Sequence, residues 1–329
     1  FKDNSFIKVF FPDPWNNQTV IKPKILERAY KLPRIYAKNY TDFRISKNLN
    51  KIFEFLYICF KFISIFNLIK IFKIFIQTFL TKGFKNYNLF FLFDLISINI
   101  FENIIKHKNI NYCHIFLNSI AHFQHNNWNE IKNYKIFFKY TDAICNKILS
   151  LSDNCDQSII YNGFTQKKIK TEYLLRPVNP NKFLKEIGIN FHKLSTNMTN
   201  GGILEFKNSK LKFYNLKKLK KFNLYGYKFF ELKELRGNKV FFRIQVKSNY
   251  KFTNKESDNF IQKNLSYDNK LKKQPLKKKN FNKEIFDNVK FLKTTGKHHF
   301  RGKLLSKRKL KYKKIIENRE IFKIIEKYF

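Results

Sequence analysis

The sequence has few acidic residues and little alanine, glycine or proline. Asp and Glu total 24 against 66 Lys and Arg, which gives the 329 residues a formal net charge of +42. Lys, Asn, Ile, Phe and Tyr, the residues of A+T-rich codons, are abundant, whereas there are only 9 Gly and 7 Pro. Codon bias would also enrich Glu, so it does not explain the whole imbalance. The charge leaves two interpretations open: compositional drift, or attraction to nucleic acid or an anionic membrane surface.

The sequence also lacks a cysteine pattern. No cysteines have CxxC spacing and no secretory signal precedes them, which argues against a disulfide framework and against a cysteine zinc site. We expect reduced thiols in a cytoplasmic protein, at Cys59, Cys113, Cys145 and Cys155. Met198 is the only methionine and the chain begins at Phe1. We therefore expect the sequence to be incomplete at its amino end, so that a catalytic residue upstream of Phe1 would lie outside it.

No apolar run reaches the length of a transmembrane helix. The most apolar region, from Ile45 to Leu80, is interrupted by polar side chains at Glu54, Lys61, Asn67, Lys70 and Lys73. Helical periodicity places six polar residues within about half of the helical wheel: Lys51, Glu54, Lys61, Lys70, Lys73 and Gln77. The pattern predicts one long amphipathic helix packed on a soluble domain and no transmembrane helix. Association with a membrane surface is the alternative, because basic amphipathic helices bind there.

The order of elements in the first half of the chain predicts the fold class. Three apolar runs that lead into polar residues indicate strands, at Ser5–Phe11, Tyr112–Leu117 and Asp156–Tyr161. Helical segments are predicted between them, at Leu89–His107 and Asn129–Leu151. Strands that alternate with helices typically form a parallel sheet. The predicted fold class is therefore α/β, with a mostly parallel sheet flanked by helices and a small inserted strand-rich subdomain.

The second half of the chain supplies that insertion. A short helix at Asn179–Gly188 has a proline start and a glycine stop. Short strand-like runs follow, and they predict a small antiparallel subdomain: Ile203–Phe206, Tyr227–Leu232 and Val240–Val246. The Lys-rich segment Asn254–Asn282 predicts a mobile loop, and Lys307–Phe329 a basic helix. We divide the chain into an α/β core at 1–200, the strand-rich insertion and Lys-rich loop at 201–290, and a return to the core at 291–329.

The segment Phe116–Glu130, FLNSIAHFQHNNWNE, concentrates polar, metal-capable side chains directly after a predicted strand. Asn118 and His122 are four residues apart and His125 is three further on, so on a helix or tight loop these side chains share one side. Histidine is the commonest ligand of zinc-like metals, whereas asparagine coordinates weakly. The alternative is that both histidines satisfy buried hydrogen bonds.

Three other segments hold candidate site residues. Asp13, between two prolines, either lines a pocket or anchors its loop to the body of the protein. Asn162–Gln166 leaves a strand end and by itself indicates a turn. His298 and His299 are adjacent within Gly296–Gly302. On an extended chain adjacent side chains point to opposite sides, so at most one of them would face a site; a charged, exposed loop is the alternative.

In the order of these segments, the chain resembles bacterial members of the alkaline phosphatase superfamily, close to the type I phosphodiesterase/nucleotide pyrophosphatase branch. The resemblance runs through most of the chain, and its most distinctive block is NSIAHFQHNNW. The resembling segments are FPDPWNNQTVIKP, DLISINIFENIIKHKNINYCHIFLNSIAHFQHNNW, YTDAICNKIL, SIIYNGFTQ, LLRPVNPNKFLKEIGI and TTGKHHFRGKLL.

This resemblance implies a mostly parallel sheet with two metal ions at its carboxyl edge and a Ser or Thr nucleophile, which is expected upstream of Phe1. In that pattern Asn118 stands where an Asp ligand is expected, while His122 keeps the His ligand. The turn Asn162-Gly163-Phe164 replaces an Asp-His pair, and His298 matches the last His ligand. Two divalent ions need several anionic ligands, so these departures should remove at least one metal site.

The expected function is therefore a divergent phosphoester hydrolase, of the phosphodiesterase/nucleotide pyrophosphatase type, with an incomplete metal-ligand set. The expected ligands of a divalent metal, with zinc as the candidate, are His122, His298 and Asn118; the expected site-lining residues are His125, Trp128, Asp13 and Asn162. The substrate would be a phosphorylated small molecule or nucleotide-like, and nonspecific contact with polyanions follows from the charge. The alternatives are a non-catalytic binding protein on the same fold and a basic nucleic-acid-binding protein.

Overall fold

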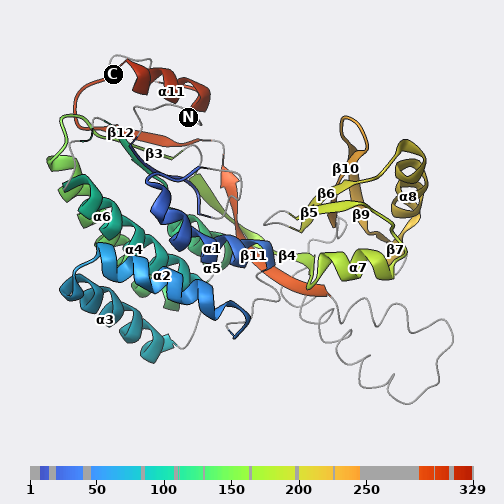
Figure 1. Cartoon of the computed structure of the whole chain (residues 1–329), viewed down its shortest axis with the longest axis horizontal. Coiled ribbons are helices and arrows are strands. Elements are labelled where there is room, and N and C mark those ends of the chain that lie inside the picture. The colour runs from blue at the N-terminus through green and yellow to red at the C-terminus, as the bar shows by residue number, and fades with distance from the viewer. Residues whose placement is uncertain are drawn as a thin grey trace. The chain divides into compact units, whose positions relative to one another are not determined.

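A computed structural model gives the structure of the chain (Figure 1). It describes residues 8–14, 20–39, 46–82, 86–106, 110, 112–128, 130–162, 165–196, 200–224, 227–244, 289–299, 301–310 and 315–327. The chain divides into two compact units. The first comprises Phe1–Phe60, Asn111–Phe116 and Lys170–Thr294, and the second comprises Lys61–Ile110, Leu117–Ile169 and Thr295–Phe329.

The first unit contains a parallel pair of short strands, β1 (Val9–Phe11) and β2 (Cys113–Ile115), with Val9 opposite Cys113. Val9 and Phe11 are buried and Phe10 between them is half-buried, the alternation expected of a strand. The helices η1 (Lys24–Leu26), α1 (Glu27–Asn39), η2 (Ser46–Asn48) and α2 (Leu49–Phe62) follow. Glu54 on α2 accepts from Lys31 on α1 at 2.9 Å and from Lys51 at 2.8 Å, which joins the two helices.

The first unit also contains a strand-rich body, residues 179–244. Its four-stranded antiparallel sheet has the order β5-β6-β10-β9. These strands are β5 (Lys193–Thr196), β6 (Gly201–Glu205), β9 (Phe230–Glu234) and β10 (Lys239–Ile244). A short antiparallel pair, β7 (Asn223–Leu224) with β8 (Tyr227–Lys228), precedes β9.

Two helices accompany this sheet. At α7 (Pro180–Glu186), the Asn179 side chain accepts from the Lys182 amide at 3.0 Å, which satisfies one of the free amides of the first turn. The helix ends before Gly188, whose φ of 76° is a left-handed conformation that glycine adopts without strain. α8 (Ser209–Lys221) is capped by Asn208 in the same way. The helices and the sheet enclose an apolar core with Phe183, Leu204, Leu219, Phe230 and Val240 at its centre.

The second unit is built mainly from helices: α3 (Ile65–Lys82), α4 (Asn86–Lys106), α5 (Ser119–Asn127) and α6 (Ile131–Asp153). α4 lies against α3, α5 and α6 (Figure 1), and the rings of Phe91 and Tyr140 stack at 4.7 Å between α4 and α6. Within the described residues, Tyr87–Lys106 is long and apolar enough to cross a bilayer by length and composition alone. Of the most apolar window in this helix, 72% is buried inside the protein.

Four strands and a terminal helix complete the chain. β3 (Ile159–Asn162) pairs antiparallel with β12 (Lys303–Ser306), and β4 (Thr165–Pro177) pairs with β11 (Val289–His299). The Lys307 ammonium donates to three carbonyls at the end of α6, those of Ser152, Asp153 and Cys155, at 3.1, 3.0 and 2.7 Å. A cation there satisfies the last carbonyls of α6 and complements the helix dipole. The last helix is α11 (Asn318–Glu326), which starts with a capping box.

The prediction of a mostly parallel sheet flanked by helices is wrong. Among the strands that the structure describes, the parallel arrangement is found in the two-stranded β1–β2 pair, whereas β3–β12, β7–β8 and the four-stranded sheet are antiparallel. The order strand, helix, strand predicted that neighbouring strands would pair through helical crossovers. β3 pairs instead with β12, and an antiparallel partner needs no crossover.

Several elements lie where the patterns placed them. α4, α6 and α7 overlap the expected helices, and β6, β9 and β10 overlap the expected strand runs beyond residue 200. The single helix expected over Ile45–Leu80 is instead two helices, α2 and α3, which are separated at Ser64. The expected Lys-rich loop Asn254–Asn282 lies outside the described residues.

Candidate functional site

The amino terminus of α5 is held by a carboxylate from α4. Asp94 is buried, and its Oδ2 accepts from the amides of Asn118 and Ser119 at 3.0 and 2.8 Å and from the Ser119 hydroxyl at 2.5 Å. These contacts satisfy free amides of the first turn and place a negative charge at the positive end of the helix dipole. Asn118, which was predicted to be a metal ligand, occupies the N-cap position of α5. Asp94 thereby fixes the helix that carries His122 and His125.

His122 packs into the interior of the helical unit. Its ring stacks on Phe90 of α4, with centroids 4.0 Å apart and planes 3° from parallel, and its Nε2 atom is enclosed by protein. Burial, together with a smaller effect of the nearby His125, lowers the pKa of His122 to about 3. An imidazole in this environment is neutral near neutral pH, and its stacked ring anchors α5 against α4.

His125 and His298 both hydrogen-bond to one amide side chain, that of Gln166. Their ring centroids lie 4.6 Å apart at 78°. Gln166 Nε2 lies 3.0 Å from His125 Nε2 and 3.1 Å from His298 Nδ1, while His125 Nδ1 lies 3.1 Å from the Gly296 carbonyl oxygen. We call these three side chains the His–Gln cluster. It joins α5, the start of β4 and the end of β11.

The hydrogen bonds of the His–Gln cluster fix its protons. A carbonyl oxygen only accepts, so His125 Nδ1 must donate to Gly296, and in the neutral ring Nε2 must then accept. Gln166 therefore presents its NH₂ group, which donates to both histidines. His298 accepts at Nδ1 and carries its own proton on Nε2. Burial lowers the pKa of both His125 and His298, which favours these neutral forms.

Backbone contacts around Gly296 hold β11 against α5. A Cβ atom at Gly296 would lie 2.3 Å from the Gln124 carbonyl oxygen and 2.5 Å from the Trp128 indole, so only glycine fits. Buried Thr295 accepts from the Trp128 amide at 2.9 Å, and the Tyr134 hydroxyl donates to the Trp128 carbonyl at 3.0 Å. Trp128 therefore contacts β11, the strand that carries His298, through Thr295 and Gly296, and these contacts set the distance between α5 and β11.

The residues of this cluster do not fit a divalent metal. In the described part of the chain no three His, Cys, Asp or Glu side chains gather as ligands of one ion. The acceptor nitrogens of His125 and His298 face Gln166 N–H groups, and a metal needs those lone pairs. The zinc site expected from His122, His298 and Asn118 stays a prediction. His298 contacts His125, and Asn118 occupies the N-cap position of α5 without a side-chain cap hydrogen bond.

Two other expected site residues are not members of the cluster. Asn162 ends β3 and its Oδ1 accepts from the Lys303 amide at 2.5 Å, an inter-strand role. Asp13 is a half-buried residue that follows β1 in the first unit. Gln166 and Thr295 had not been predicted as site residues. The segment Asn162–Gln166 by itself indicated a turn, and the 41 and 132 residues that separate Gln166 from His125 and His298 leave no local sequence signal that connects them.

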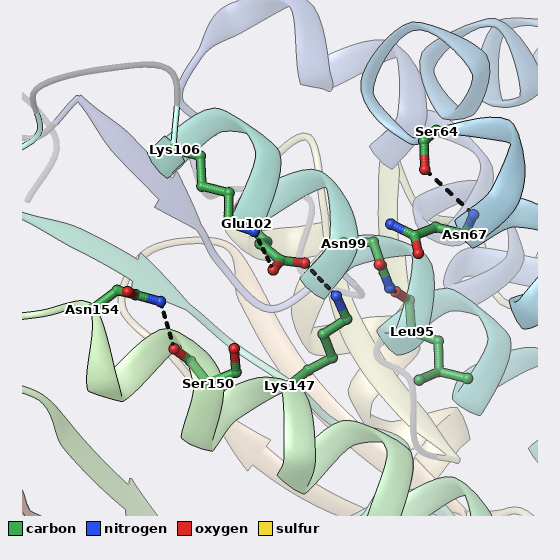
Figure 2. A network of polar contacts seen from close by, with 9 residues as sticks. All are labelled: Ser64, Asn67, Leu95, Asn99, Glu102, Lys106, Lys147, Ser150 and Asn154. Atoms are coloured by element: carbon green, nitrogen blue, oxygen red, sulfur yellow. Dashed lines mark hydrogen bonds and ion pairs between the residues drawn. The ribbon is translucent and has the colours of Figure 1, made fainter.

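A second polar group on α4 is structural. Figure 2 shows Glu102 between Lys106 of the same helix and Lys147 of α6; the Lys106 ammonium lies at 2.9 Å. Burial raises the pKa of Glu102, but hydrogen bonds from Lys147 and Lys106 outweigh it, so the pKa lies below its ordinary value. The carboxylate is committed to this ion pair, which ties α4 to α6.

Comparison of the chain with protein-family models, with curated proteins and with solved structures finds no match. The resemblance to the alkaline phosphatase superfamily therefore stays a prediction, and the candidate site rests on its own geometry.

Proposed function

We propose that this chain binds a phosphoester at the His–Gln cluster, as a divergent relative of phosphoester hydrolases with an incomplete metal-ligand set. One observation carries the proposal. The cluster joins residues from NSIAHFQHNNW, SIIYNGFTQ and TTGKHHFRGKLL, three of the segments on which the resemblance to those enzymes rests. These segments are far apart in sequence, and one side chain from each of them takes part in the same hydrogen-bonded cluster.

The chemistry of the cluster favours an anionic ligand with hydroxyl groups. Residues 289–306, which contain β11 and β12, hold several Lys and Arg and no Asp or Glu, so the local field attracts anions. His298 carries a donor proton on Nε2. Among the described residues, the enclosed Gln166 Oε1 has no hydrogen-bond partner; a ligand hydroxyl would satisfy it. A nucleotide-like phosphoester combines both features.

The test is a binding titration of the full chain with bis-p-nitrophenyl phosphate and with a nucleoside monophosphate, in wild type and His298→Ala. Loss of a hydrogen bond to a charged ligand should weaken binding about tenfold or more. His299→Ala is the matched control, because adjacent residues of a strand face opposite sides. Absence of binding by the wild type, or an equal loss in the control, would refute the proposal. Release of p-nitrophenolate in the same cuvette separates an active hydrolase from a binding protein.

A specific observation favours a second candidate, contact with nucleic acid. α8 contains no acidic residue and exposes Phe213 and Tyr214 beside lysines that include Lys217 and Lys221. Cations interleaved with aromatic rings suit a single strand, whose bases stack on the rings. Binding to a single-stranded oligonucleotide should weaken linearly in a log–log salt titration. Phe213→Ala should reduce it if stacking contributes, whereas an unchanged affinity would leave charge alone as the cause.

A further inference from the structure

α3 has apolar side chains on two opposite sides. Its inner side packs in the second unit: Leu68, Ile71 and Thr78 are 3 to 4% exposed. The Thr78 hydroxyl lies 2.8 Å from the Tyr140 hydroxyl on α6. Its outer side is almost as apolar and is exposed, with Ile69 at 59% and Leu80 at 76%. A helix that is apolar nearly all round is ordinarily covered on all sides, either by protein or by lipid.

The exposed apolar residues of α3 form one continuous stripe, which spans about 140° of the helical wheel at the usual helical period. They are Ile65, Phe66, Ile69, Phe72, Ile76, Phe79 and Leu80. Scattered apolar side chains on a surface are normal, but a stripe that runs the length of a helix marks an interaction surface. We call these seven residues the α3 stripe.

The charges beside the α3 stripe identify its partner. Exposed Lys73 lies within its arc and exposed Lys70 borders it, and α3 contains no Asp or Glu. The Lys70 ammonium lies over the Phe66 ring, 4.3 Å from its centroid, so the apolar ring and the cation share one surface. A second copy of this chain would bring the same cations together, which costs free energy. An anionic lipid surface instead offers acyl chains to the stripe and phosphate groups to the lysines.

We propose that the α3 stripe binds the surface of an anionic bilayer, with α3 lying in the plane of the headgroups. Ile, Phe and Leu side chains enter the boundary of the acyl region, and the Lys70 and Lys73 ammonium groups remain at the depth of the lipid phosphates. The interaction is peripheral, because the opposite side of the same helix is packed against α4 and α6.

The test is co-sedimentation of the full chain with phosphatidylcholine vesicles, with and without phosphatidylserine. The wild type should bind the anionic vesicles and bind the neutral ones much less. Ile69→Ser with Ile76→Ser should reduce partitioning at least tenfold, whereas Phe138→Ser with Leu149→Ser, two exposed apolar residues of α6, should not. Lys70→Gln with Lys73→Gln should weaken anionic binding about fivefold per lysine.

A charge-matched control separates this surface from the net charge of the whole chain. Lys217→Gln with Lys221→Gln on α8 removes the same charge and should leave vesicle binding unchanged. Equal losses in the two lysine pairs, or no binding of the wild type to anionic vesicles, would overturn the proposal. Concentration-dependent dimerisation that Ile69→Ser abolishes, without vesicle binding, would assign the α3 stripe to a second copy of the chain and overturn it equally. Circular dichroism verifies that each variant is folded.

Discussion

The strand-rich body and the helical unit are both rich in Phe. Among the described residues, the helical unit buries the charged side chains Asp94 and Glu102, whereas the buried polar side chains of the strand-rich body are the amides Asn200 and Asn215. Around β6 and β10 the core is a continuous apolar cluster. Around α4 the interior also contains polar and charged groups, including Asp94, Asn99, Glu102 and Thr295, and most of their described bonds join one segment to another. Apolar side chains stabilise a fold in contact with many different apolar neighbours. A buried carboxylate or hydroxyl stabilises it only when its particular hydrogen-bond donor or acceptor is in place. The candidate site adjoins this polar interior: His125 and Gln166 are half-buried and His298 is exposed.

The largest effect should come from the apolar core. Phe230 is fully buried in the strand-rich body, and Phe230→Ala should lower the free energy of unfolding by about 3–5 kcal/mol, the loss of transfer energy plus a cavity. Phe213, which is 72% exposed on α8, provides the control: Phe213→Ala should change it by less than about 0.5 kcal/mol. Urea unfolding followed by circular dichroism measures both. Equal effects would mean that the core of this body is not the one described.

A smaller loss should follow from removal of the carboxylate that holds α5. Asp94→Ala leaves the amides of Asn118 and Ser119 without their acceptor, so unfolding should become easier by about 2–3 kcal/mol. Asp94→Asn keeps an acceptor oxygen but loses the charge, and should cost about half as much. The same urea titration applies. An Asp94→Asn variant as stable as the wild type would show that the charge at the helix terminus contributes nothing.

The smallest effect is a change in pH dependence. The pKa of His122 in the folded protein is about 3, below its ordinary value of 6.5. Between these two pH values the unfolded chain binds a proton at His122 that the folded chain does not bind. Stability should therefore fall as the pH drops below about 6.5 toward 3. His122→Gln should flatten this decline between about pH 7 and pH 5, and Asn126→Ala, an exposed change on the same helix, should preserve it. An unaltered slope in His122→Gln would show that His122 is not buried as a neutral ring.

The sequence located most long elements because their signals are local. α4 and α6 follow from apolar periodicity, and α7 follows from Asn179, Pro180 and Gly188, which cap, start and stop it. The break between α2 and α3 also had a local signal. Ser64 precedes α3, and its hydroxyl accepts from the Asn67 amide at 3.4 Å. Apolar residues continue on both sides of Ser64, so the apolar pattern alone indicated one long helix.

Strand pairing and the site could not be obtained in this way. Whether β3 joins β2 or β12 depends on contacts between distant segments, and the element order alone favoured the wrong answer. For the same reason His125 and His298 could be named as candidates, while their connection through Gln166 could not. The spacing of His122 and His125 placed both on one side of α5 but did not reveal that Phe90 would cover one of them.

The most direct test of the His–Gln cluster is nitrogen NMR of the full chain with labelled histidine near neutral pH. We expect His125 to be protonated at Nδ1 and His298 at Nε2. The Gly296 carbonyl and the Gln166 amide allow no other position for the proton on either neutral ring. Addition of a phosphodiester should shift the resonances of His298 more than those of His122. A His125 protonated at Nε2, or a cationic ring at that pH, would contradict the hydrogen-bond chain on which the candidate site depends.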